Sequence, residues 1–110
     1  MVQTVRVTDP QGQQIVVRHD VSPNGDGIDD GLIIEGIKDY PNNNVTVVNR
    51  NGVKVFEAKN YDNVNNIFTG RSNITNQLQT PGTYFYVVQW TDAQGAGHRK
   101  AGYFVLKYSN

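Results

Sequence analysis

The sequence predicts an all-β fold, an antiparallel β-sandwich of about seven to nine strands. Apolar and polar residues alternate with a period of two along most of the chain. No stretch carries the roughly 3.6-residue spacing of an amphipathic helix. Turn-forming Asn, Gly, Pro and Asp residues separate the alternating runs at intervals of about 8–12 residues. A chain of 110 residues has the size of one typical domain, so we expect residues 1–110 to form a single sandwich.

The strands are expected where apolar residues alternate or cluster. These runs are residues 4–8, 15–18, 32–35, 44–49, 53–56, 84–91 and 101–108. Asn51-Gly52 lies between two of the runs and predicts a tight hairpin. Residues 60–80 carry only short apolar pieces and give a weaker signal. In the longest run, alternation places four large side chains on one face: Tyr84, Tyr86, Val88 and Trp90. We expect that face to be buried.

Tyr84 follows Pro81-Gly82 at the start of the longest run. A tyrosine just after such a turn can send its hydroxyl back to an upstream backbone group, which is the tyrosine corner of immunoglobulin-like sandwiches. The sandwich is therefore expected to be immunoglobulin-like, with a structural role for Tyr84. The aromatic residues of the last two runs either fill the core or line a sugar-binding face, and we expect core: Tyr84, Phe85, Tyr86, Trp90, Tyr103, Phe104 and Tyr108.

Composition excludes several functional classes. Ten acidic residues balance ten basic ones, and no basic stripe with interleaved aromatics indicates nucleic-acid binding. There is no cysteine, which removes disulfide frameworks, thiolate metal sites and cysteine nucleophiles. No apolar run approaches the ~20 residues that cross a bilayer. His19 and His98 are the only histidines, and no nucleophile motif accompanies them, so we expect solvated strand histidines and no catalytic function.

The most informative segment is Asp20-Val-Ser-Pro-Asn-Gly-Asp-Gly-Ile-Asp-Asp-Gly31, in which carboxylate and amide side chains alternate with glycine. One interpretation is a calcium loop, because Ca²⁺ prefers several oxygen ligands and a glycine-permitted sharp turn. The candidate ligands are Asp20, Asn24, Asp26, Asp29 and Asp30. The other interpretation is a turn in which Asn and Asp side chains bond nearby backbone amides. No other cofactor is indicated.

Six ordered motifs carry a family resemblance. They are Ser22-Pro-Asn-Gly-Asp-Gly-Ile-Asp-Asp30, Ile34-Glu-Gly-Ile37 with Tyr40-Pro-Asn-Asn43, Val47 to Glu57, Tyr61 with Phe68-Thr-Gly-Arg-Ser72, Pro81-Gly-Thr-Tyr-Phe-Tyr86, and Lys100-Ala-Gly-Tyr-Phe-Val-Leu106. Together they resemble the gliding motility-associated C-terminal domain, the type B sorting domain of the type IX secretion system in Bacteroidetes. Asn51 stands where that family usually has tryptophan, and Asp29 replaces an asparagine.

The resemblance implies a non-enzymatic export signal at the C-terminus of a larger secreted protein, often an adhesin. Such a domain folds in the periplasm, and outer-membrane machinery recognises it and delivers the cargo to the cell surface. The implied partners are the type IX translocon and an outer-membrane protein of the PorP/SprF type, with no membrane insertion by the domain itself. We expect the domain to be a monomer. The alternative is a calcium-stabilised extracellular adhesion or carbohydrate-binding module.

A sandwich has open strand edges, so the last run, Ala101 to Tyr108, could add to a partner's sheet. We expect this run and the Asn24–Asp30 loop to form the recognition surface. The residues assigned to it are Asn24, Gly25, Asp26, Gly27, Asp30, Tyr103, Phe104, Leu106 and Lys107.

Overall fold

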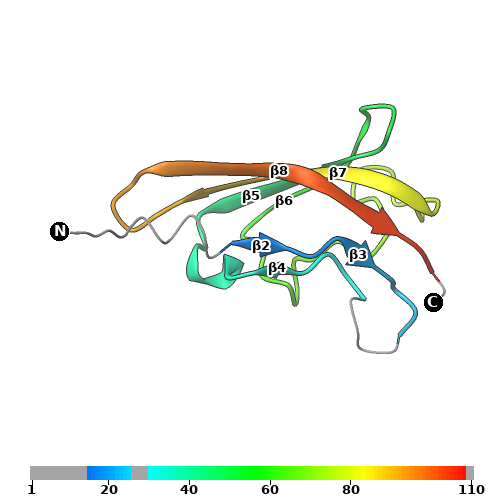
Figure 1. Ribbon diagram of the computed structural model, residues 1–110, viewed down its shortest axis with the longest axis horizontal. Helices are drawn as coiled ribbons and strands as arrows, with labels where there is room; N and C mark the ends of the chain where they lie inside the picture. Colours follow the sequence, from blue (N-terminus) through cyan, green and yellow to red (C-terminus); the bar gives the residue numbers. More distant parts are fainter. Residues whose placement is uncertain (1–14, 26–29, 109–110) are drawn as a thin grey trace.

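The computed structural model describes residues 15–25 and 30–108, and these form an all-β, sandwich-like fold (Figure 1). The larger layer is a five-stranded sheet in the order β3-β8-β7-β5-β6. Its strands are β3 (Asp20–Val21), β5 (Asn43–Val48), β6 (Lys54–Lys59), β7 (Gly82–Thr91) and β8 (Gly97–Leu106). The predicted strand at residues 4–8 lies outside the described residues.

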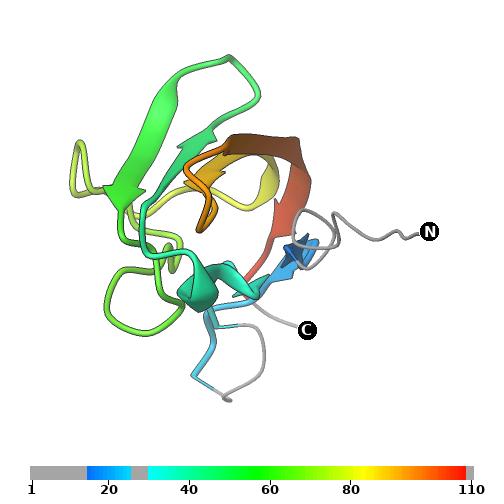
Figure 2. The same ribbon diagram turned by 90° about the vertical axis from the view of Figure 1, so that its left-hand side faces the viewer.

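The second layer pairs β2 (Val16–Val17) with β4 (Ile34–Glu35). It continues into a single 3-10 turn, η1 (Ile37–Asp39), and the loop-rich segment 60–80 lies alongside. Seen from the end, the larger sheet curves around the interior, and η1 lies across from it (Figure 2). The described residues contain no helix long and apolar enough to span a bilayer.

Among the described strands, all pairs but one are antiparallel, as predicted. The exception is β3, which runs parallel to β8 with Asp20 opposite Val105 and Val21 opposite Leu106. Sequence alternation cannot reveal this pairing, because β3 has two residues and its partner lies about eighty positions away. The parallel pairing matters for the site, because both strands then leave the sheet at the same end of the molecule (Figure 1).

One apolar cluster fills the space between the layers. The expected buried face of β7 is confirmed, since Tyr84, Tyr86, Val88 and Trp90 all lie in that cluster. Its other buried members are Ile15, Val17, Val21, Leu32, Ile34, Ile37, Tyr40, Val45, Val47, Val55, Phe56, Tyr61, Phe68, Phe104 and Leu106. Because every described strand contributes to this cluster, the two layers share one core.

The hairpin predicted from Asn51-Gly52 joins β5 to β6. The Asn49 side-chain oxygen accepts the amides of Asn51 at 2.9 Å and Val53 at 3.0 Å, and Gly52 has the positive φ of 81° that such a turn requires. The pairing of β5 with β6 shifts its register between Val47 and Val48, so that Val55 has no partner on β5. This bulge explains why the consecutive residues Val55 and Phe56 are both buried.

Candidate functional site

The parallel pairing of β3 with β8 brings together two segments that the sequence analysis singled out separately. The amide of Val105 donates to the carbonyl of His19 at 2.7 Å, and the amide of Lys107 donates to the carbonyl of Val21 at 3.0 Å. Directly beyond Val21 the chain enters the Asp/Gly loop, while β8 ends at Leu106. The loop and the end of the last strand therefore emerge side by side (Figure 1).

Side chains reinforce this junction. The ring nitrogen Nδ1 of His19 lies 2.8 Å from the carbonyl oxygen of Tyr103, and the two rings are 5.1 Å apart. His19 is exposed, as predicted for a solvated histidine, and it covers part of the Tyr103 ring. Tyr103 itself remains 51 % exposed. An exposed aromatic ring held at its backbone by a neighbouring strand is a pre-organised contact surface.

The residues assigned to partner recognition divide into exposed and buried sets. Asn24, Gly25, Tyr103 and Lys107 are exposed, and Asp30 is partly exposed. Phe104 and Leu106 are both 0 % exposed and belong to the core, so the prediction that their side chains meet a partner is wrong. Alternation along β8 is the reason, because residues with even numbers near its end point into the sandwich.

The last strand was expected to be a free sheet edge, and this expectation is wrong for the C-terminal end of β8. β3 pairs with Val105 and Leu106, so this part of β8 has neighbours on both sides. From Gly97 to Phe104, the strand order of the described residues places only β7 beside β8. Strand addition by a partner at Val105 and Leu106 is therefore excluded, because β3 already occupies that edge.

The described part of the Asp/Gly loop shows turn contacts. The amide of Gly25 donates to Asp30 Oδ1 at 3.0 Å, and the amide of Asn24 donates to the Ser22 carbonyl at 2.7 Å. Gly25 has a φ of 81°, which favours glycine. Asp30 thus acts as predicted for the structural interpretation of the loop, with its carboxylate on a nearby amide.

The calcium interpretation stays a prediction. Of its five candidate ligands, Asp26 and Asp29 lie outside the described residues, as does the partner-surface residue Gly27. Asp20 is exposed on β3, and Asn24 and Asp30 lie at the two ends of the loop. Within residues 15–25 and 30–108, no group of three His, Asp or Glu side chains is placed to hold a metal ion.

A buried tyrosine fixes the return end of the loop. The hydroxyl of Tyr61 donates to the Leu32 carbonyl at 2.7 Å and accepts the amide of Phe68 at 2.9 Å. The amide of Leu32 in turn donates to the Phe68 carbonyl at 2.8 Å. Burial raises the pKa of Tyr61 well above its usual value, because the phenolate would lose its hydration there. These bonds hold the chain just after the loop rigidly against the segment 60–80.

The tyrosine corner is present as predicted. The hydroxyl of Tyr84 donates to the carbonyl of Thr80 at 2.6 Å, four residues upstream. Tyr108 repeats the arrangement from the far end of the chain, with its hydroxyl donating to the Gln79 carbonyl at 2.6 Å. The expected core role of the aromatic residues holds for Tyr84, Tyr86, Trp90 and Phe104. It is wrong for Phe85 and Tyr103, which are exposed opposite one another on β7 and β8.

Sequence reasoning also missed the surroundings of His98. Its ring stacks on Trp90 with the ring centres 5.4 Å apart, and Nε2 lies 2.8 Å from Asp92 Oδ2. His98 is half-buried, so the prediction of a solvated histidine is wrong at this position. The turn between the last two strands could have revealed this contact. Asp92 and His98 flank the turn at residues 93–96, so they lie close together in the hairpin.

Residues 15–106 match the model of the CHU_C type IX secretion signal domain family. The chain belongs to this family. No curated protein matches the chain. The CHU_C match covers the Asp/Gly loop, β3 and all of β8, so the residues of the junction lie within the matched part except for Lys107, which follows it directly. A CHU_C domain is a secretion signal and not an enzymatic domain, and its cargo is secreted or displayed at the cell surface.

Proposed function

We propose that this CHU_C domain ends a larger secreted protein and directs that protein through the type IX secretion system to the cell surface. Membership of the family over residues 15–106 is the observation that carries the proposal. The machinery at the outer membrane recognises the domain as a folded module. The partners are the translocon and, for retention at the surface, an outer-membrane protein of the PorP/SprF type.

The internal ties of the domain support recognition in the folded state. A flexible signal would lose binding free energy on ordering, whereas a rigid surface would not. Here the candidate surface rests on the backbone bonds between β3 and β8 and on the buried Tyr61 hydroxyl. The first set of bonds fixes the end of β8 beside β3, and the second fixes the chain just after the Asp/Gly loop at Leu32, so both segments are held in place before any partner arrives.

The recognition surface is the junction of the Asp/Gly loop with the end of β8. Its exposed residues are Asn24, Gly25, Tyr103 and Lys107, and Asp30 shapes the loop from within. The assigned residues Asp26 and Gly27 follow Gly25 in the sequence and lie outside the described residues. Phe104 and Leu106 support this surface from the core, where a charged substitution would unfold the domain rather than test an interface.

An export assay tests the proposed function. Residues 1–110 are fused behind a signal peptide and a neutral reporter, and expressed in a type IX-competent host and in its translocon-deficient derivative. We expect surface or extracellular reporter in the competent host alone. Folded reporter fusion that stays in the periplasm of both strains would contradict the proposal that this domain is a sufficient signal.

Matched variants test the surface. Tyr103→Ser and Lys107→Glu change exposed residues at the junction, and both should reduce export while the circular dichroism spectrum stays unchanged. Val64→Ser is the control, because Val64 is a large apolar residue that is 74 % exposed and belongs to neither β3, β8 nor the Asp/Gly loop. Equal export of the folded junction variants and the control would place recognition elsewhere on the domain.

A further inference from the structure

Four polar residues form a straight row across the larger sheet. Lys59 on β6 lies opposite Asn44 on β5, Asn44 lies opposite Gln89 on β7, and Gln89 lies opposite Arg99 on β8. Their strand neighbours Asn43, Val45, Val88 and Trp90 are buried. Because side chains alternate between the faces of a sheet, the row points to the outer face, away from the core.

The row lines an open hollow of about 520 Å³. Its other lining residues are Asn42, Asn43, Trp90, Thr91, Gly97 and His98. The lining includes two permanent cations, Lys59 and Arg99, and no carboxylate. Neither cation forms an ion pair within the described part of the chain. Lys59 also attracts the Glu57 carboxylate beside the row, but the lining itself carries an excess of positive charge, which favours an anionic ligand.

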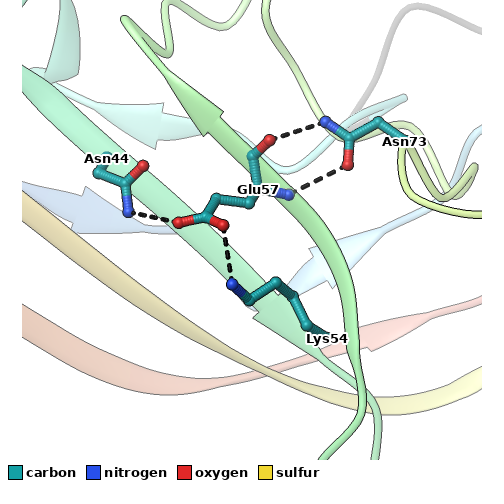
Figure 3. A network of polar contacts seen from close by, with 4 residues as sticks. All are labelled: Asn44, Lys54, Glu57 and Asn73. Carbon is teal, nitrogen blue, oxygen red and sulfur yellow. Dashed lines mark hydrogen bonds and ion pairs between the residues drawn. The ribbon is translucent and has the colours of Figure 1, made fainter.

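Glu57, an acidic residue in contact with the row, is already engaged. Glu57 accepts a bond from Lys54 at 2.8 Å and another from the Asn44 side-chain nitrogen at 3.2 Å (Figure 3). These bonds, the Lys54 ion pair foremost, lower the pKa of Glu57 and keep it ionised. Glu57 also holds the Asn44 amide in one orientation, which fixes the middle of the row.

That orientation leaves one polar atom without a partner. The side-chain oxygen of Asn44 is buried and accepts no hydrogen bond. Because this oxygen has almost no accessible surface, a ligand in the hollow meets the exposed neighbours of Asn44 and not the oxygen itself. The amide of Gln89 and the hydroxyl of Thr91, next along the hollow, can pair with the hydroxyl groups of a ligand.

We propose that this row binds an acidic oligosaccharide. Lys59 and Arg99 pair with its carboxylate or sulfate groups, and Gln89 bonds a hydroxyl between them. The two cations lie three strand spacings apart, about 14 Å, so the ligand spans more than one sugar unit. Nucleic acid fits less well, because the chain has zero net charge and the aromatic rings exposed on this face lie outside the hollow.

Calorimetric titration with oligogalacturonate, a chain of carboxylated sugars, tests this site on the whole 110-residue chain. The uncharged methyl ester of the same oligomer, a poly-glutamate peptide and a single-stranded oligonucleotide serve as the other ligands. We expect saturable binding of oligogalacturonate, which weakens with added salt, and at least about tenfold weaker binding of the ester. Equal binding of the ester, tighter binding of the peptide or oligonucleotide, or no binding of oligogalacturonate would overturn the proposal.

Variants locate the site. Arg99→Gln removes a charge from the row, and Gln89→Ala removes an amide between the cations. Each should weaken oligogalacturonate binding by about tenfold, whereas Lys38→Gln should not, because Lys38 is an exposed cation on η1 in the other layer. All three side chains are exposed, so the fold should persist, and a denaturation curve checks this. Equal weakening by Lys38→Gln and Arg99→Gln would show binding by net charge alone and overturn the assigned site.

Discussion

Asn73 pairs with the backbone of Glu57 as a neighbouring strand would. Its side-chain oxygen accepts the Glu57 amide at 3.1 Å, and its side-chain nitrogen donates to the Glu57 carbonyl at 2.8 Å (Figure 3). Glu57 lies on β6, which is an edge strand of the larger sheet. The Asn73 side chain therefore satisfies the amide and carbonyl of Glu57 on this open edge. Unpaired edge groups would otherwise be a template for intermolecular pairing.

Two further asparagines use the same geometry. Asn63 bonds both the amide and the carbonyl of Ile34 on β4, at 2.9 Å and 2.8 Å. Asn43 does so with Tyr61, at 2.8 Å and 3.2 Å. The three contacts join the segment 60–80 to both layers. This segment consequently stays ordered without forming strands, apart from an isolated bridge between Arg71 and Leu78.

Removing the Asn73 side chain should loosen the edge of β6. We expect Asn73→Ala to lower the free energy of unfolding by about 0.5–1.5 kcal/mol, because the side chain is exposed and water replaces part of what is lost. The amide of Glu57 should exchange with deuterium faster. Asn65→Ala is the control, since no bond from the Asn65 side chain to another described residue is present. Unchanged exchange at Glu57 would contradict the pairing.

Much of the sheet could be predicted from sequence because each long strand carries its own signal. Alternation identified the buried face of β7, Asn51-Gly52 identified the hairpin, and the position of Tyr84 identified the corner. Residues 97–100 were missed as part of β8 because Gly, His, Arg and Lys give no apolar alternation. Their pairing with the apolar strand β7 overrides that weak local preference.

The candidate site was harder to predict, since it depends on contacts between distant residues. The two segments of the junction were both identified, the loop by its Asp/Gly pattern and β8 by its apolar run. Which β8 residues face outward was predicted wrongly for Phe104 and Leu106, because recognition was assigned to the whole strand instead of one face. The row that begins at Lys59 has no local signature, since its four members come from four strands.

The Tyr61 hydroxyl should make stability sensitive to alkaline pH. Its pKa is raised in the folded state above the usual 10.0, so its contribution is complete below pH 10 and is lost as the pH rises further, where only the unfolded chain ionises. Tyr61→Phe should cost about 1–3 kcal/mol at neutral pH, because the Phe68 amide and Leu32 carbonyl lose their buried partner. Urea denaturation at pH 7 to 11 should show this difference shrinking above pH 10. A difference that stays constant with pH would contradict the assignment.

The contact between Asp92 and His98 predicts a loss of stability in acid. The hydrogen bond from His98, followed by the Ala96 amide, lowers the pKa of Asp92 below its usual 3.8. A lowered pKa in the folded state stabilises the fold above that value, and this contribution disappears as the pH falls through the folded pKa. Asp92→Asn keeps the turn acceptor but lacks the charge. It should destabilise the domain at pH 7, and its difference from the wild type should shrink as the pH falls below 3.8. A difference between the variant and the wild type that stays constant as the pH falls would contradict the assignment.

Gly31 lies where the Asp/Gly loop rejoins the core, and its lack of a side chain permits that contact. A Cβ atom there would lie 2.5 Å from Ile67 Cδ1 and 3.0 Å from the Phe68 carbonyl oxygen, so side chain and backbone would both have to move. Gly31→Ala should therefore destabilise the domain by about 1–3 kcal/mol, as overpacking does. Gly97→Ala is the matched substitution, because a Cβ at Gly97 meets no atom within 4 Å and its φ is not positive. That variant should be neutral or slightly stabilising, since alanine restricts the unfolded chain. Thermal and urea denaturation of both variants measure the difference, and equal effects would show that the loop does not depend on close packing at Gly31.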